Sequence, residues 1–119
     1  MTAADDDGPG PLPLAGVTVV AVEQAVAAPL ATRHLADLGA RVIKIERAGE
    51  GDFARAYDAT VHGQASHFVW LNRGKESIEL DLTSERGHRI ALGLVDRADV
   101  VISNLSPGAM DRLGLGAAE

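Results

Sequence analysis

The stretch Gln24 to Arg47, QAVAAPLATRHLADLGARVIKIER, decides the fold of this 119-residue chain. Pro29 suits the first turn of a helix, where its missing N–H costs nothing, and Gly39 suits a helix end. Between them, apolar side chains recur at helical spacing, at Leu30, Ala31, Leu35 and Leu38. The segment after the glycine, 41–46 (RVIKIE), has the pattern of a strand. We therefore predict a loop, a helix and a strand in succession.

Another strand is predicted before this unit, at 17–22 (VTVVAV). An almost unbroken run of β-branched residues is typical of a strand buried on both faces, as in parallel sheets. A strand, a helix and a strand in this order form a crossover unit, which is right-handed almost by default. The predicted fold class is α/β with a Rossmann-like parallel sheet.

The middle of the chain predicts shorter elements. Glycines and acidic residues without periodicity indicate a surface loop over 48–63, and a short helix is expected over 65–72. In 77–82 the apolar residues alternate with polar ones, which is the period of a half-buried strand. One face of that strand should meet the core.

The last third predicts a second long helix and a final strand. Ser84 suits the helix cap, and Gly87 and Gly93 weaken the helix. Its inner stripe is predicted at Ile90, Leu94, Val95 and Ala98. We expect a third buried strand at 100–102, followed by a short helix that begins at Pro107.

Composition bounds the partners and the compartment. The net charge of −6 argues against nucleic acid or an anionic membrane as the main partner, and the absence of cysteine excludes disulfides and thiolate sites. Residues 1–13 carry three aspartates and predict a flexible acidic lead rather than a secretory signal. No apolar run approaches the roughly 20 residues that span a bilayer. We expect a cytoplasmic protein with no membrane partner.

The loop 24–28 allows two interpretations. It leaves a strand end and enters a helix N-terminus, where free N–H groups favour anions. Its small residues also suit close packing of the helix against the sheet, which spacing alone favours. Binding of NAD is disfavoured because the loop has alanines in place of the glycines of the dinucleotide fingerprint, although Glu46 lies where a ribose-binding acid would.

Two arginines follow element ends. Arg47 and Arg112 are placed to hold phosphate by paired hydrogen bonds. The alternative is a solvated side chain or an ion pair, for which the available acids are Glu46, Glu50 and Asp111. Both interpretations stay open at this point.

Other polar residues give weaker signals. The four histidines lack metal-binding spacing, so no metal site is predicted, and no serine lies in a nucleophile motif. Glu50 and Asp52 favour a solvated turn over a catalytic carboxylate pair. Asn72, Arg73 and Lys75 favour charge at a helix end over a ligand site. No catalytic residue is therefore assigned.

Four motifs in order carry a resemblance that runs from about Leu14 to Gly116: PLAGVTVV, LADLGARVIKIER, NRGKESIELDL and SPGAMDRLGLG. With GDFAR (51–55) between the second and the third, the chain resembles the family III CoA-transferases. The segments EQAVAAP and HFVWLNRGKES are most similar to members that act on small dicarboxylic acids such as mesaconate or itaconate. The resemblance implies an incomplete N-terminal domain over 14–119, with part of the Rossmann-like sheet of the large domain.

The family binds the CoA nucleotide and pantetheine along this domain. The matching positions here, implied to bind CoA, are Val26, Ala27, Arg47, Leu80, Asn104, Leu105 and Arg112. The two arginines would take the phosphates. The chain departs from the family pattern at Thr83, where many members have lysine, and at Leu105 and Ser106, where the pattern is aromatic and then arginine. Each departure removes a contact, so weaker CoA binding is expected.

The resemblance implies CoA transfer between small carboxylic acids through an aspartate that lies farther along the chain in the family. This leads us to expect a fragment that is inactive alone, with a CoA thioester and a carboxylic acid as substrates. Full-length relatives form interlocked homodimers, and this chain is expected to associate with a complementary chain. The alternatives are a stand-alone CoA-binding module, an interaction subunit and a fragment of an acyl-CoA racemase.

Overall fold

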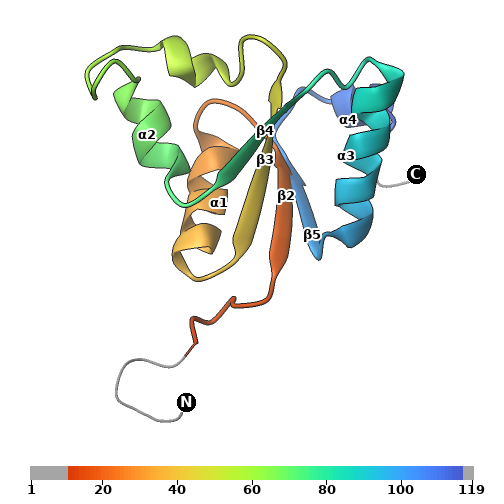
Figure 1. Ribbon diagram of the computed structural model, residues 1–119, viewed down its shortest axis with the longest axis horizontal. Coiled ribbons are helices and arrows are strands. Elements are labelled where there is room, and N and C mark those ends of the chain that lie inside the picture. Colours follow the sequence, from red (N-terminus) through yellow and green to blue (C-terminus); the bar gives the residue numbers. More distant parts are fainter. Residues whose placement is uncertain (1–10, 117–119) are drawn as a thin grey trace.

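The computed structural model describes residues 11–116, so most of the predicted acidic lead, 1–13, lies outside the described residues. Four parallel strands form a single sheet in the order β4-β3-β2-β5. The elements in chain order are β2 (Thr18–Val22), α1 (Ala27–Asp37), β3 (Arg41–Arg47), the 3-10 helix η1 (Phe53–Ala56), α2 (Ser66–Asn72), β4 (Glu76–Leu80), α3 (Glu85–Arg97), β5 (Val100–Ser103) and α4 (Ala109–Arg112). Figure 1 shows α1 and α2 on one side of the sheet and α3 and α4 on the other. The predicted α/β class is confirmed.

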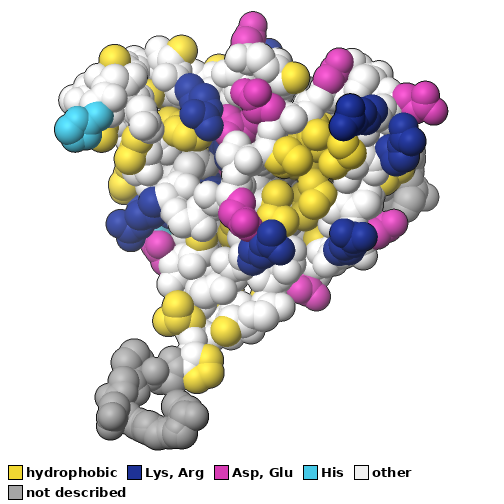
Figure 2. Space-filling view, in the orientation of Figure 1, with side chains coloured by type: hydrophobic (Ala, Val, Ile, Leu, Met, Phe, Trp, Pro, Cys, Tyr) yellow, Lys and Arg dark blue, Asp and Glu magenta, His cyan; other side chains and the backbone are white. Residues whose placement is uncertain are grey.

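Strand β2 is buried on both faces, as predicted. Val20 and Val22 belong to the core on the α3 side, whereas Val19 and Ala21 belong to the core on the α1 side. Successive side chains of a strand point to opposite faces, so an unbroken apolar run supplies both cores at once. Figure 2 shows further hydrophobic side chains gathered between β4 and α3 on the visible face.

Helix α1 buries a stripe that differs from the predicted one. The helix begins at Ala27, before Pro29, and its buried residues are Ala28, Pro29 and Thr32. Ala31 and Leu38 are exposed, which corrects the prediction for these two positions. Small side chains on the buried stripe let the helix approach the sheet closely, and periodicity alone did not identify that face.

Helix α3 is capped as predicted. The Ser84 hydroxyl accepts the Gly87 backbone N–H at 3.0 Å. Gly87 and Ala91 are the buried residues, with Leu94, Val95 and Ala98 packed against the core. Ile90 is exposed, contrary to the prediction, because it lies beside the line that Gly87 and Ala91 define.

Strand β5 is not buried, which corrects the prediction for 100–102. Its side chains Val100 and Val101 are 42% and 38% exposed, because β5 occupies one edge of the sheet. Strand β4, at the other edge, is half-buried as predicted, although it ends at Leu80. Helix α4 begins after Gly108, two residues later than the predicted start at Pro107. No helix within 11–116 has the length and apolar character needed to cross a membrane.

Candidate functional site

A cavity of about 530 Å³ opens at the carboxyl ends of the strands. Its walls come from the residues that end or follow the four strands and from the residue after α4: Val22, Glu23, Gln24, Ile45, Glu46, Arg47, Ala48, Gly51, Asp52, Leu80, Asp81, Leu82, Thr83, Leu105 and Leu113. The chain steps outward from β2 to β4 and then returns to β5 on the other side of β2, so the strand order switches direction here. Open α/β sheets bind ligands at such a switch.

Several residues that the resemblance assigns to CoA lie at this hollow. Arg47, Leu80 and Leu105 line the cavity. Arg112 lines a shallower depression beside it, which shares Leu82, Thr83 and Leu113 with the cavity. Val26 and Ala27 are exposed at the start of α1 and line neither hollow.

The seventh of these residues, Asn104, is hydrogen-bonded within the fold. Its Oδ1 accepts the Gln24 N–H at 3.0 Å, and its Nδ2 donates to the Gln24 carbonyl oxygen at 2.8 Å. This reciprocal pair joins the segment after β5 to the loop after β2. Asn104 therefore shapes the site from outside the cavity lining.

Arg47 leaves the end of β3 with an exposed guanidinium. Its Nη1 lies 3.2 Å from Oε1 of Glu50, and the two side chains are 66% and 78% exposed. An exposed ion pair contributes only about 0–1 kcal/mol. Arg47 can therefore exchange this carboxylate for a phosphate at little cost, and a phosphate accepts two parallel hydrogen bonds from a guanidinium.

The start of α1 faces the same edge of the sheet. Val26, in the N-cap position, gives no side-chain cap, and the first turn contains no acidic residue. Its first backbone N–H groups therefore have no side-chain partner of this kind, and such groups favour anions.

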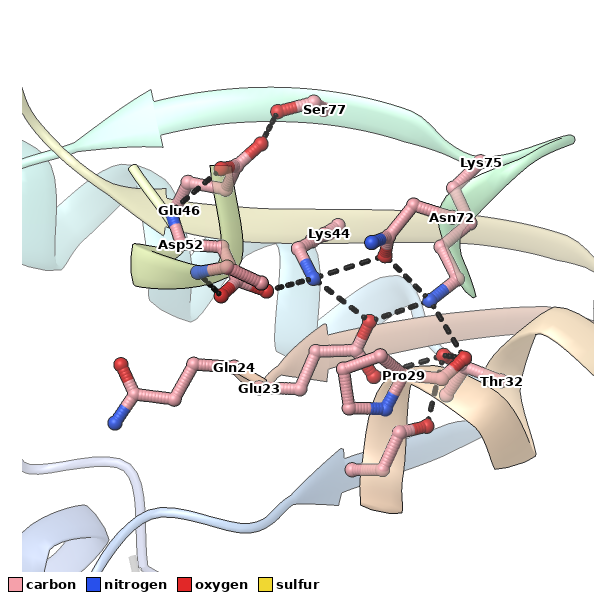
Figure 3. Close-up of polar contacts among 12 residues, drawn as sticks. Glu23, Gln24, Pro29, Thr32, Lys44, Glu46, Asp52, Asn72, Lys75 and Ser77 are labelled. Atoms are coloured by element: carbon pink, nitrogen blue, oxygen red, sulfur yellow. Dashed lines mark hydrogen bonds and ion pairs between the residues drawn. The ribbon is translucent and has the colours of Figure 1, made fainter. Parts of the chain in front are cut away.

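A buried network of charged and polar side chains adjoins the cavity, and we call Glu23, Lys44, Asp52, Asn72 and Lys75 the ion network (Figure 3). Two of its members, Glu23 and Asp52, also line the cavity. Lys44 Nζ donates to Asp52 Oδ2 at 2.8 Å and to Asn72 Oδ1 at 2.9 Å. The same nitrogen lies 3.4 Å from Glu23 Oε2. Lys75 Nζ donates to Glu23 Oε2 at 2.7 Å and to Asn72 Oδ1 at 2.8 Å.

The ion network balances its own charge, with two lysines and two carboxylates. The side chain of Lys44 is 1% exposed and those of Glu23 and Asp52 are fully buried. Removing such charges from water costs several kcal/mol per ion unless they are paired and hydrogen-bonded. Burial lowers the pKa of Lys75, and the contact with Glu23 opposes that shift. The network therefore fixes the loop after β2, strand β3, η1 and α2 relative to one another.

Glu46, at the end of β3, extends this polar region. Burial by itself would raise the pKa of Glu46, but hydrogen bonds from Arg55, Ser77 and the Asp52 N–H lower that pKa to about 2. The Arg55 Nε and Nη2 atoms each lie 2.7 Å from a different Glu46 carboxylate oxygen. Glu46 is thus a fixed anion that holds the turn over 51–55.

Two expectations from the sequence are wrong here. Asp52 is 2% exposed and paired with Lys44, so it does not belong to a solvated turn, although Glu50 does. Lys75 is paired with the buried Glu23 and is not simply charge at a helix end. Two features of the sequence could have indicated the buried ion pairs. Lys44 lies within the apolar run VIKI, and Glu23 directly follows a buried strand, and a buried charge requires a partner.

Comparisons with known proteins show which family the chain resembles in sequence. The family model described as CoA-transferase family III matches residues 14–119. Acetyl-CoA:oxalate CoA-transferase of Acetobacter aceti is 45% identical, over 90% of this chain and 28% of the relative. Succinyl-CoA:glutarate CoA-transferase of Mus musculus is 40% identical, over 87% of this chain and 24% of the relative. The chain thus spans less than a third of the length of these curated relatives.

Solved structures agree in fold as well. A crystal structure of a Mycobacterium tuberculosis protein superposes with a TM-score of 0.83 at 45% identity, over 90% of this chain and 29% of that chain. A CAIB/BAIF family protein from Brucella suis superposes with a TM-score of 0.82 at 39% identity, over 90% and 29% of the two chains. Together with the family model, these matches show that the chain belongs to CoA-transferase family III.

Proposed function

We propose that this chain forms the CoA-binding part of an acyl-CoA:carboxylate CoA-transferase. The observation that carries the proposal is the cavity at the carboxyl ends of the strands, where Arg47 stands beside apolar walls. CoA has the matching chemistry, because it joins charged phosphates to a long pantetheine arm. We assign the phosphates to Arg47 and Arg112, and we assign the less polar parts to Leu80 and Leu105.

The relatives' names suggest the second substrate. Three of them are named as transferases to oxalate, glutarate and mesaconate, which are all small dicarboxylates. We therefore propose a small dicarboxylic acid as the acceptor in the transfer reaction of the whole protein. Thr83 stands where many family members have lysine, and Leu105 stands where the family pattern has an aromatic residue. Because both residues line the cavity, we propose a lower affinity for CoA than the family pattern would give.

The exposed edge strand supports one further part of the proposal. Val100 and Val101 of β5 present apolar surface. We propose that a complementary chain covers this edge, as an added strand or a packed surface would.

Isothermal titration of the purified chain with CoA tests the proposal. We expect saturable binding that Arg47→Ala and Arg112→Ala each weaken about tenfold or more, since a hydrogen bond to a charged group contributes about 1.5–3 kcal/mol. Arg41→Ala is the matched control, because Arg41 starts the same strand β3 at its opposite end and pairs with Glu76 at 2.6 Å. Folded wild-type chain without saturable CoA binding would overturn the proposal.

A further inference from the structure

We infer that Asp52 and Asn104 are positioning residues, which hold the loop from Glu23 to Val26 in the shape that forms one wall of the cavity. The inference rests on the proposed CoA binding, because it concerns how that site is kept ready. Neither residue needs to touch CoA to act in this way. Each acts through the loop backbone.

The loop contains a backbone conformation that needs support. Ala25 has φ +69°, in the left-handed region that few residues other than glycine adopt. Such a conformation is strained for a residue with a Cβ, and it persists where surrounding contacts enforce it. In this chain the contact comes from a side chain, since Asp52 Oδ1 accepts the Ala25 N–H at 3.0 Å.

Asp52 is itself held in place from several directions. Its Oδ1 also accepts the Ala54 N–H at 2.9 Å, at the start of η1, and its Oδ2 lies 2.8 Å from Lys44 Nζ. With 2% of its surface exposed, Asp52 has no room for another rotamer without breaking these contacts. The ion network therefore fixes one side of the loop.

Asn104, which follows the neighbouring strand β5, holds Gln24, the residue before Ala25. It bonds both the N–H and the carbonyl oxygen of Gln24, 80 residues away in sequence. Two adjacent residues of the loop are thus tied to side chains that follow β3 and β5. Figure 3 shows Gln24 extending away from the ion network, while the loop leads into α1.

We call the hydrogen bonds from Asp52 to Ala25 and from Asn104 to Gln24 the clamp, and their positions connect it to ligand binding. Glu23, Gln24 and Asp52 all line the cavity, and Val26 is the residue from which α1 begins. A shift of the loop would move both the wall and the first N–H groups of the helix. Binding of CoA then requires the loop to be ordered again, so that losing the clamp weakens affinity even though no CoA contact is deleted.

The first test uses Asn104→Ala, with Asp99→Ala as its matched control. Asp99 makes the same kind of bond at the opposite end of the same strand pair, where its Oδ2 accepts the Thr18 N–H at 2.8 Å. Both residues are exposed, so both variants should fold. We expect CoA to bind about tenfold more weakly to Asn104→Ala and with unchanged Kd to Asp99→Ala. Equal effects of the two substitutions would overturn the role of Asn104.

The second test compares Asp52→Ala with the double variant Asp52→Ala, Ala25→Gly. Glycine adopts φ +69° without strain, so it should recover part of the CoA affinity that Asp52→Ala loses. Backbone amide exchange supplies a readout without CoA: we expect Asp52→Ala to speed exchange at Ala25 at least about tenfold more than at Val20 in the core of β2. A uniform rise at both amides would indicate general destabilisation and would overturn the clamp.

The outcomes separate the inference from the proposed function. If wild-type chain binds no CoA, the proposed function fails, and the exchange rates at Gln24 and Ala25 still decide whether the clamp exists. If wild-type chain binds CoA and folded Asn104→Ala and Asp52→Ala bind equally well, the inference fails alone. Recovery of affinity by Ala25→Gly would support both.

Discussion

Lys44 shows how one residue can organise a site that it does not line. Its charge lies in an otherwise apolar strand, between Ile43 and Ile45, and it is met by Asp52 and Glu23 from two different loops. Pairing is obligatory because an isolated ammonium in this position would lose its hydration without compensation. The position of the loop after β2 therefore depends on Lys44 within β3 and on Asp52 in the segment that follows β3.

Glu46 should make the free energy of unfolding depend on pH in the acid range. Its pKa is lowered from an ordinary value of 4.5 to about 2 in the folded chain, so the stabilisation is complete above the ordinary value and is lost as pH falls through the folded value. We expect wild-type chain to lose on the order of 3 kcal/mol through this group between about pH 5 and pH 2.

Urea unfolding of Glu46→Gln over that range provides the measurement. The variant should be less stable at neutral pH and should lose less stability on acidification. Glu50→Gln is the control, because Glu50 is exposed and should leave the pH dependence nearly unchanged. A variant as acid-sensitive as wild type would contradict the role given to Glu46.

Gly51 lies in the turn that holds Asp52, where its lack of a Cβ is required. Its φ is +70°, and an added Cβ would lie 2.7 Å from Glu46 Oε1. We expect Gly51→Ala to lower the free energy of unfolding by about 2–3 kcal/mol, because backbone strain and crowding add. Gly49→Ala, with φ +89° and no atom near an added Cβ, should cost only about 1 kcal/mol. Equal costs in chemical denaturation would show that crowding against Glu46 is unimportant.

At the scale of elements, the two glycines of α3 have opposite roles. A Cβ on Gly87 would overlap the Asp81 carbonyl oxygen, whereas nothing lies near a Cβ added to Gly93. We therefore expect Gly87→Ala to destabilise the chain by more than about 2 kcal/mol and Gly93→Ala to stabilise it by about 0.5–1 kcal/mol. Thermal unfolding followed by circular dichroism measures this: we expect a lower Tm for Gly87→Ala and a higher Tm for Gly93→Ala than for the wild-type chain.

At the scale of the whole molecule, the core is thin and one edge of the sheet is apolar. The buried hydrophobic residues are mostly valine and alanine, which bury less area than aromatic side chains. From these two features we expect marginal stability and association through β5.

A charged substitution at the edge strand tests this association. Val100→Lys places a charge on an edge where valine is 42% exposed, so we expect less self-association and little change in the free energy of unfolding. Sedimentation velocity over a range of concentrations measures it. Wild-type chain that stays monomeric at every concentration would contradict the expectation.

The sequence by itself determined the kinds of element and their order. The apolar run of β2 and the Ser84 cap of α3 were predictable because strand burial patterns and helix caps depend on residues close together in the chain. The resemblance to family III was equally a matter of local motifs in a fixed order. The positions of Arg47 and Arg112 at element ends were predictable for the same reason, whereas their binding of phosphate stays a prediction.

Only the tertiary structure decided which strands lie at the edges and which charges meet. The apolar pattern of β5 does not reveal that it lies at the edge beside β2, and the pattern of α1 does not reveal that its small side chains face inward. The contacts of Asp52 with Ala25 and of Asn104 with Gln24 span 27 and 80 residues. Such pairings follow from strand order and packing, which no local stretch of sequence specifies.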